Sequence, residues 1–141
     1  MNESILFDGI RKTKEYASMV SDATGLLSCG KKLPLLVNGL CDGAERALLY
    51  SLVKDLKEKS GKTVLILTGE ERKANKLNEF FTSSSLKSAF YPVRDFNFYD
   101  MTSSHELEHE RLGILSGIFS SSLDVVISTP EASMQYTIPR K

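Results

Sequence analysis

The sequence predicts an α/β fold with a mostly parallel sheet, on three observations. Short β-rich runs alternate with longer segments whose apolar residues recur at three- and four-residue spacing, the mark of amphipathic helices. Thr63 to Leu67 is continuously β-rich, as is typical of a strand buried on both faces. The apolar run 35–38 leads into a glycine-containing turn and then into a helical segment. Strands and helices in this alternation favour a parallel sheet with helices on both faces.

The N-terminal part is expected to be a helical arm over residues 1–33, followed by an α/β domain over 34–141. Pro34 is expected to end helical structure and to open a first strand at 35–38. The remaining elements, in chain order, are helix 44–59 capped by Gly61, strand 63–67, helix 70–82, strand 88–91, aromatic loop 95–100, helix 104–120, strand 123–127 and a short helix capped by Thr129 and begun by Pro130. Thr68 and Glu71 fit a capping box at the start of helix 70–82.

Bulk composition is that of an ordinary globular domain. The chain has 141 residues, 41% hydrophobic and 26% charged, with 18 basic and 18 acidic residues. A zero net charge gives no general drive toward nucleic acid, where phosphate neutralisation dominates binding. There is no long apolar run for a membrane span and no signal-peptide pattern at the N-terminus. Cys29 and Cys41 are expected to be reduced thiols in a cytoplasmic protein.

The turn after 35–38 has the layout of a nucleotide-binding P-loop without its chemistry. In the pattern G-x-x-x-x-G-K-[ST], the lysine holds the outer phosphates and the hydroxyl binds magnesium. Gly39 takes the first position, but Ala44, Glu45 and Arg46 take the last three, while Gly43 assists the turn. Glu45 places a carboxylate where phosphate needs a cation, and Arg46 cannot bind magnesium. These five residues therefore predict a degenerate phosphate loop with a structural role.

A second motif, His105-Glu106-Leu107-Glu108-His109, matches the zinc-hydrolase pattern H-E-x-x-H on a predicted helix. No third histidine exists in the chain, and nothing brings a distant carboxylate such as Glu131 close. The acidic residues around the motif are typical of an exposed helix start, where they suit the helix dipole. We therefore expect no metal at this segment.

The aromatic loop 95–100 could stack nucleic-acid bases through Phe96, Phe98 and Tyr99. Arg94 is its only basic neighbour, so core packing or a domain interface is the better interpretation. No histidine lies near Cys41 in the sequence, which argues against a catalytic thiol.

Several stretches, in order and at similar spacing between about residues 30 and 138, resemble one protein family. They are Leu36-Val37-Asn38-Gly39-Leu40 with Ala44, Arg46, Ala47 and Leu48; Val64-Leu65-Ile66-Leu67-Thr68 followed by Ala74-Asn75-Lys76-Leu77; Tyr91-Pro92-Val93-Arg94-Asp95; Glu110-Arg111-Leu112 through Leu115; and Val125-Val126-Ile127-Ser128-Thr129-Pro130-Glu131-Ala132. Together they resemble the N-terminal module of the bacterial transcription-repair coupling factor, which is similar to the first domain of the repair protein excinuclease B.

The resemblance implies a three-layer, P-loop-NTPase-like domain of the RecA-like helicase type that has lost its ATPase motifs. It implies a non-catalytic module that uses no cofactor, in a parent protein whose separate motor uses ATP and magnesium to move on DNA and displace stalled RNA polymerase. The parent's N-terminal region recruits the repair protein excinuclease A, mainly through the module that follows this one. The sequence also ends abruptly after its last short helix, as expected of a piece cut at a domain boundary. Two alternatives remain open at this point: an active ATPase lobe with a nonstandard loop, and a zinc hydrolase.

Overall fold

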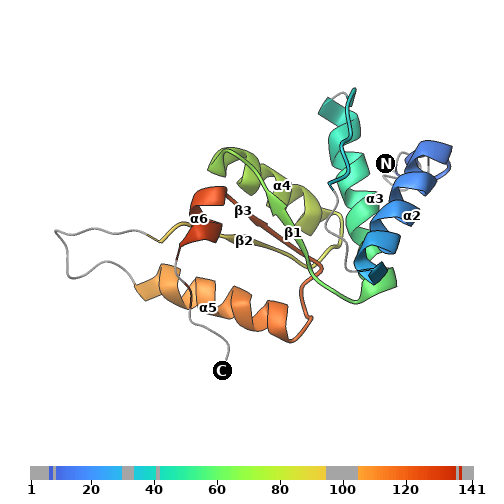
Figure 1. The fold of residues 1–141 in the computed structure, drawn as a ribbon. Helices are drawn as coiled ribbons and strands as arrows, with labels where there is room; N and C mark the ends of the chain where they lie inside the picture. Colours follow the sequence, from blue (N-terminus) through green and yellow to red (C-terminus); the bar gives the residue numbers. More distant parts are fainter. Residues whose placement is uncertain are drawn as a thin grey trace. The chain divides into compact units, whose positions relative to one another are not determined.

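The computed structural model describes residues 7, 9–29, 34–40, 42–94, 105–135 and 137. The chain divides into two compact units, Met1–Lys62 and Thr63–Lys141, called here the first and second unit. The elements are α2 (Lys14–Cys29) and α3 (Asp42–Ser60) in the first unit, then β1 (Val64–Leu67), α4 (Glu71–Ser83), β2 (Ser88–Tyr91), α5 (His105–Phe119), β3 (Val125–Ser128) and α6 (Pro130–Met134) in the second (Figure 1). Within these ranges, no helix has both the length and the apolar character needed to cross a membrane.

The second unit confirms the predicted α/β fold with a parallel sheet. Its strands lie in the order β1-β3-β2, and both pairs are parallel. Ile66, Ile127 and Phe90 lie side by side across the three strands. Every strand is followed along the chain by a helix, so the connections between parallel strands are helical crossovers. The predicted strands at 63–67, 88–91 and 123–127 each differ from the observed ones by at most two residues at either end.

Alternate residues of β3 face two different helices. Val126 packs in a cluster with Tyr91, Ile114 of α5 and Ala132 of α6. The neighbouring residues Val125 and Ile127 point to the opposite face, where α4 lies against β2 and β3 (Figure 1). On that face α4 contributes its buried residues, Ala74, Leu77 and Phe81. The apolar run of β3 is therefore explained by helices covering both of its faces.

The predicted first strand, 35–38, is not formed. Residues 34–40 have no regular secondary structure and all of them are exposed, with Leu36 84% exposed. An apolar run favours a buried strand, but a strand exists only when a neighbouring strand satisfies its backbone N–H and C=O groups. Among the described residues no strand pairs with 34–40, so its composition alone does not make it a strand.

Two of the three predicted helix caps are confirmed. Gly61 ends α3 with a φ of 67°, and its N–H donates to the Lys57 carbonyl at 2.8 Å. Thr129 caps α6, because its hydroxyl accepts a hydrogen bond from the Ala132 N–H at 3.2 Å. The capping box at α4 is wrong: the cap residue is Glu70, which makes no side-chain cap. The Thr68 hydroxyl instead donates to the Glu70 carbonyl at 2.9 Å.

In the first unit, a polar contact ties α2 and the segment before it to α3. The Tyr16 hydroxyl donates to an Asp55 carboxylate oxygen at 2.5 Å, and Arg11 forms an ion pair with the other oxygen of the same carboxylate. Tyr16 is almost completely buried. In the same unit, the rings of Phe7 and Tyr50 stack with their centroids 4.4 Å apart. Asp55 of α3 therefore holds two donors, Tyr16 of α2 and Arg11 of the segment before α2.

Tyr16 is expected to lose its proton later than an ordinary tyrosine. Burial, and then the hydrogen bond to Asp55, raise the pKa of Tyr16 above the usual value of about 10. The folded state thus keeps a proton that the unfolded chain releases. The resulting stabilisation is complete below pH about 10 and is lost as the pH rises through the folded-state pKa. The absorbance of the Tyr16 tyrosinate is measured as the difference between the wild-type chain and a Tyr16→Phe variant. It should appear only as the pH rises through the raised, folded-state pKa of Tyr16. A difference that titrates near the ordinary value would contradict the contact.

Candidate functional site

The degenerate phosphate loop does not have the strand-loop-helix frame that the sequence predicts. Gly39 has a left-handed φ of 80°, which fits a turn glycine. However, α3 begins at Asp42, so Gly43, Ala44, Glu45 and Arg46 all belong to the helix. The expected role of Gly43 in the turn is therefore wrong. Because residues 34–40 form no strand, the backbone has no rigid element there from which to cradle a phosphate.

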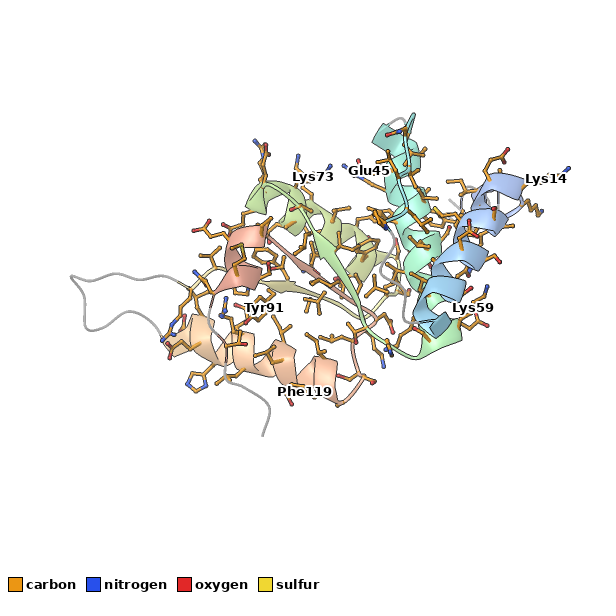
Figure 2. All side chains as sticks on the ribbon, viewed as in Figure 1. Lys14, Glu45, Lys59, Lys73, Tyr91 and Phe119 are labelled. Carbon is orange, nitrogen blue, oxygen red and sulfur yellow. The ribbon has the colours of Figure 1, made fainter. Side chains whose placement is uncertain are left out.

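Glu45 ends the first turn of α3, where Figure 2 labels it, and Arg46 follows directly. Glu45 is half-buried and Arg46 is exposed. A carboxylate at this end of a helix interacts favourably with the positive end of the helix dipole. The same carboxylate opposes an incoming phosphate, so its position suits helix stability rather than nucleotide binding.

A cavity of about 640 Å³ lies next to this turn in the first unit. It is lined by one face of α2, by the apolar residues Leu35, Leu36, Val37 and Leu40, and by the start of α3. Its charged lining residues are Glu15 and Asp22, and no lysine or arginine of the described ranges lines it. An acidic and apolar lining opposes a triphosphate, so the described residues around this space do not replace the missing lysine.

We expect that repairing the two substituted positions does not restore nucleotide binding. The double change Glu45→Lys with Arg46→Thr supplies the ammonium and the hydroxyl of an active loop. The strand that should precede the loop would still be missing, so calorimetry with magnesium-ATP should give no heat of binding for either the wild type or the variant. Binding by the wild type that disappears in Arg46→Ala would instead show a rewired, working loop.

The H-E-x-x-H segment forms the start of α5, as predicted. Glu106 and His109 are exposed there. In the part of the chain that the structure describes, no group of three or more His, Cys, Asp or Glu side chains is placed to hold a metal ion. Glu108, inside the motif, makes an ion pair with Arg94. The aromatic loop 95–100 and Cys41 lie outside the described residues.

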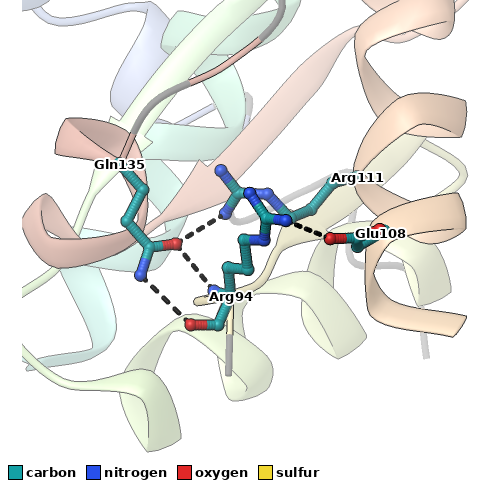
Figure 3. Close-up of polar contacts among 4 residues, drawn as sticks. All are labelled: Arg94, Glu108, Arg111 and Gln135. Carbon is teal, nitrogen blue, oxygen red and sulfur yellow. Dashed lines mark hydrogen bonds and ion pairs between the residues drawn. The ribbon is translucent and has the colours of Figure 1, made fainter. Parts of the chain in front are cut away.

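The structure brings together four polar residues at the carboxyl end of β2 (Figure 3). The side-chain oxygen of Gln135 accepts from the Arg94 backbone N–H at 2.7 Å and from Arg111 Nη1 at 3.1 Å. The Gln135 amide nitrogen donates back to the Arg94 carbonyl at 3.3 Å. Arg94 also pairs with Glu108 of α5. Gln135, which follows α6, thus links the segment after β2 to α5.

Arg111 is the buried centre of this cluster. Only 5% of it is exposed, and its Nη1 also donates to the Pro92 carbonyl at 2.5 Å. Its guanidinium carbon lies 4.2 Å from the centre of the Tyr91 ring, a cation–π contact. The second nitrogen, Nη2, and the Tyr91 hydroxyl are both buried and have no hydrogen-bond partner among the described residues. A pocket of about 210 Å³ lies beside them. This arrangement can accept a negatively charged group.

Sequence reasoning missed this cluster because it interpreted Arg94 as isolated. One signal was present in the sequence. Arg111 precedes Ile114, Leu115 and Ile118 by three, four and seven residues, so it belongs to the apolar stripe of its helix. A cation in such a stripe is buried and needs specific partners. Its location also fits a general rule, because open parallel sheets bind ligands outside the carboxyl ends of their strands.

Comparison of the chain with protein-family models, with curated proteins and with solved structures finds no match.

Proposed function

We propose that this chain is a non-catalytic module of a bacterial transcription-repair coupling factor. In this proposal it belongs to the region that recruits excinuclease A to RNA polymerase stalled at DNA damage. The observation that carries the proposal is the ordered set of stretches between residues 30 and 138 that resemble the N-terminal module of that family. The parallel α/β architecture of the second unit is compatible with it.

The chemistry of the degenerate loop supports the non-catalytic part of the proposal. Glu45 and Arg46 stand where an ATPase needs lysine and a hydroxyl, and both lie in a helix without a preceding strand at 34–40. ATP, magnesium, DNA and RNA polymerase are therefore assigned to other parts of the parent protein, in the cytoplasm. The finer fold assignment, a degenerate three-layer helicase lobe of the RecA-like type, belongs to the same proposal.

The proposal predicts that residues 1–141 alone bind excinuclease A weakly or not at all, and that adding the following module of the parent protein restores binding. The reason for this expectation is that, in the resembled family, most contacts with excinuclease A are assigned to the following module. Pull-downs with purified excinuclease A should compare residues 1–141, the extended protein and the following module alone.

Two outcomes would contradict this assignment. Tight binding by residues 1–141, equal to that of the extended protein, would place the interface within this chain. No binding by any of the three proteins would remove recruitment of excinuclease A from the function altogether.

A further inference from the structure

Among the described residues, the lining of the pocket at the carboxyl end of β2 has a net positive charge. Arg94 and Arg111 contribute two positive charges to it and Glu108 contributes one negative charge. The hydroxyl-bearing residues Tyr91 and Thr137 also line the pocket. Its volume, about 210 Å³, suits a small ion rather than a nucleotide. A small site with a positive balance and several N–H and O–H donors is chemically suited to an oxyanion.

Two buried donors beside the pocket lack acceptors within the described ranges. Arg111 Nη2 and the Tyr91 hydroxyl have no hydrogen-bond partner there, although the two residues are only 5% and 6% exposed. Buried donors of this kind are almost always satisfied by protein, ordered water or a bound ion. The hydrogen-bond acceptors of Arg111 are neutral: the Pro92 carbonyl and the Gln135 amide oxygen. Among the described residues, no carboxylate forms an ion pair with Arg111, so these residues leave its charge unneutralised.

We propose that this pocket binds a small oxyanion, either phosphate or a carboxylate, through Arg111 Nη2 and the Tyr91 hydroxyl. Such a ligand would satisfy both donors and neutralise the buried guanidinium. The ion pair of Arg94 and Glu108 forms the rim, and each of its side chains is 42% exposed. Exposed ion pairs are weak, so the rim can shift to admit the ion to the two buried donors. This inference does not rest on the proposed function.

The first test is a titration of residues 1–141 followed by NMR, observing backbone amides and arginine side-chain N–H groups. Sodium phosphate and sodium acetate are added in separate series, each compared with sodium chloride at equal ionic strength. The Arg111 Nε–H signal and the amides around Tyr91 should shift and saturate with phosphate, with acetate or with both. Saturation with phosphate alone identifies the ligand as a phosphate, and saturation with acetate alone identifies a carboxylate. Shifts no larger than those with chloride would overturn the proposal, leaving ordered water as the partner of the two donors.

The second test uses variants that separate binding from folding. Tyr91→Phe removes only the hydroxyl and keeps the ring under Arg111, so it should weaken binding by roughly 3- to 10-fold with the fold retained. Arg111→Lys keeps the positive charge but loses the planar guanidinium with its several N–H donors, and should weaken binding by about tenfold or more. The matched control is Arg72→Gln, on the exposed face of α4 outside the pocket, which should bind as the wild type does.

The Tyr91→Phe result decides the proposal even if Arg111→Lys fails to fold. Unchanged affinity in Tyr91→Phe, with its fold confirmed by its amide spectrum, would place the anion elsewhere on the chain and overturn the assignment.

Discussion

Replacing Phe81 with alanine is expected to lower the free energy of unfolding of the second unit by about 3–5 kcal/mol. Phe81 is 0% exposed near the end of α4, on the sheet face opposite α5. Its ring also contacts Phe80, with centroids 5.5 Å apart. Removal of the ring loses the transfer energy of a large side chain and leaves a cavity that the parallel sheet cannot close. Urea denaturation followed by circular dichroism measures the change.

Phe119 provides the matched control on α5, another helix of the second unit. It lies at the end of α5 and is 61% exposed. Phe119→Ala should change the free energy of unfolding by only about 0.5 kcal/mol, as for most surface substitutions. Equal losses in the two variants would mean that α4 does not cover the sheet as described.

Replacing Arg111 with alanine is expected to cost roughly 2–4 kcal/mol of unfolding free energy. Hydrogen bonds from a charged group contribute about 1.5–3 kcal/mol, and a cation–π contact adds about 0.5–2 kcal/mol. The variant also leaves the buried Pro92 carbonyl without the Arg111 donor. The same denaturation measurement applies, with Arg72→Ala as the exposed control on α4.

The size of the Arg111 effect distinguishes a structural centre from a solvated side chain. Arg72→Ala should fall within about 0.5 kcal/mol of the wild type. If Arg111→Ala were equally mild, the contacts to Pro92, Gln135 and Tyr91 would not stabilise the second unit, and the buried cluster at the end of β2 would be wrong.

The candidate sites were predictable to different degrees. The loss of phosphate chemistry at Glu45 and Arg46 follows from residue type alone, because no backbone conformation gives a carboxylate the charge of lysine. The cluster around Arg111 joins Arg94, Glu108 and Gln135, which span more than forty positions of the chain. No local sequence pattern predicts contacts between residues so far apart in the chain. Only the burial of Arg111 was visible, through its place on the apolar stripe of its helix.

The sequence by itself determined the three strands, their parallel pairing and the helices that connect them. Apolar periodicity, glycine after α3 and threonine-proline before α6 act within a few residues, so they can be interpreted without knowledge of the fold. Helix α5 at His105–Phe119 differs by one residue at each end from the predicted 104–120.

The tertiary structure alone decided whether the apolar run 35–38 became a strand and where each polar group found its partner. A strand requires a neighbour whose backbone satisfies its own, and no strand of the described ranges pairs with 34–40. Thr68 is held at the end of the sheet, where its backbone N–H donates to the Ser128 carbonyl at 3.0 Å, and its hydroxyl bonds to the Glu70 carbonyl instead of capping α4. In the first case an apolar composition was not enough, because a strand needs a partner strand that the local sequence does not supply.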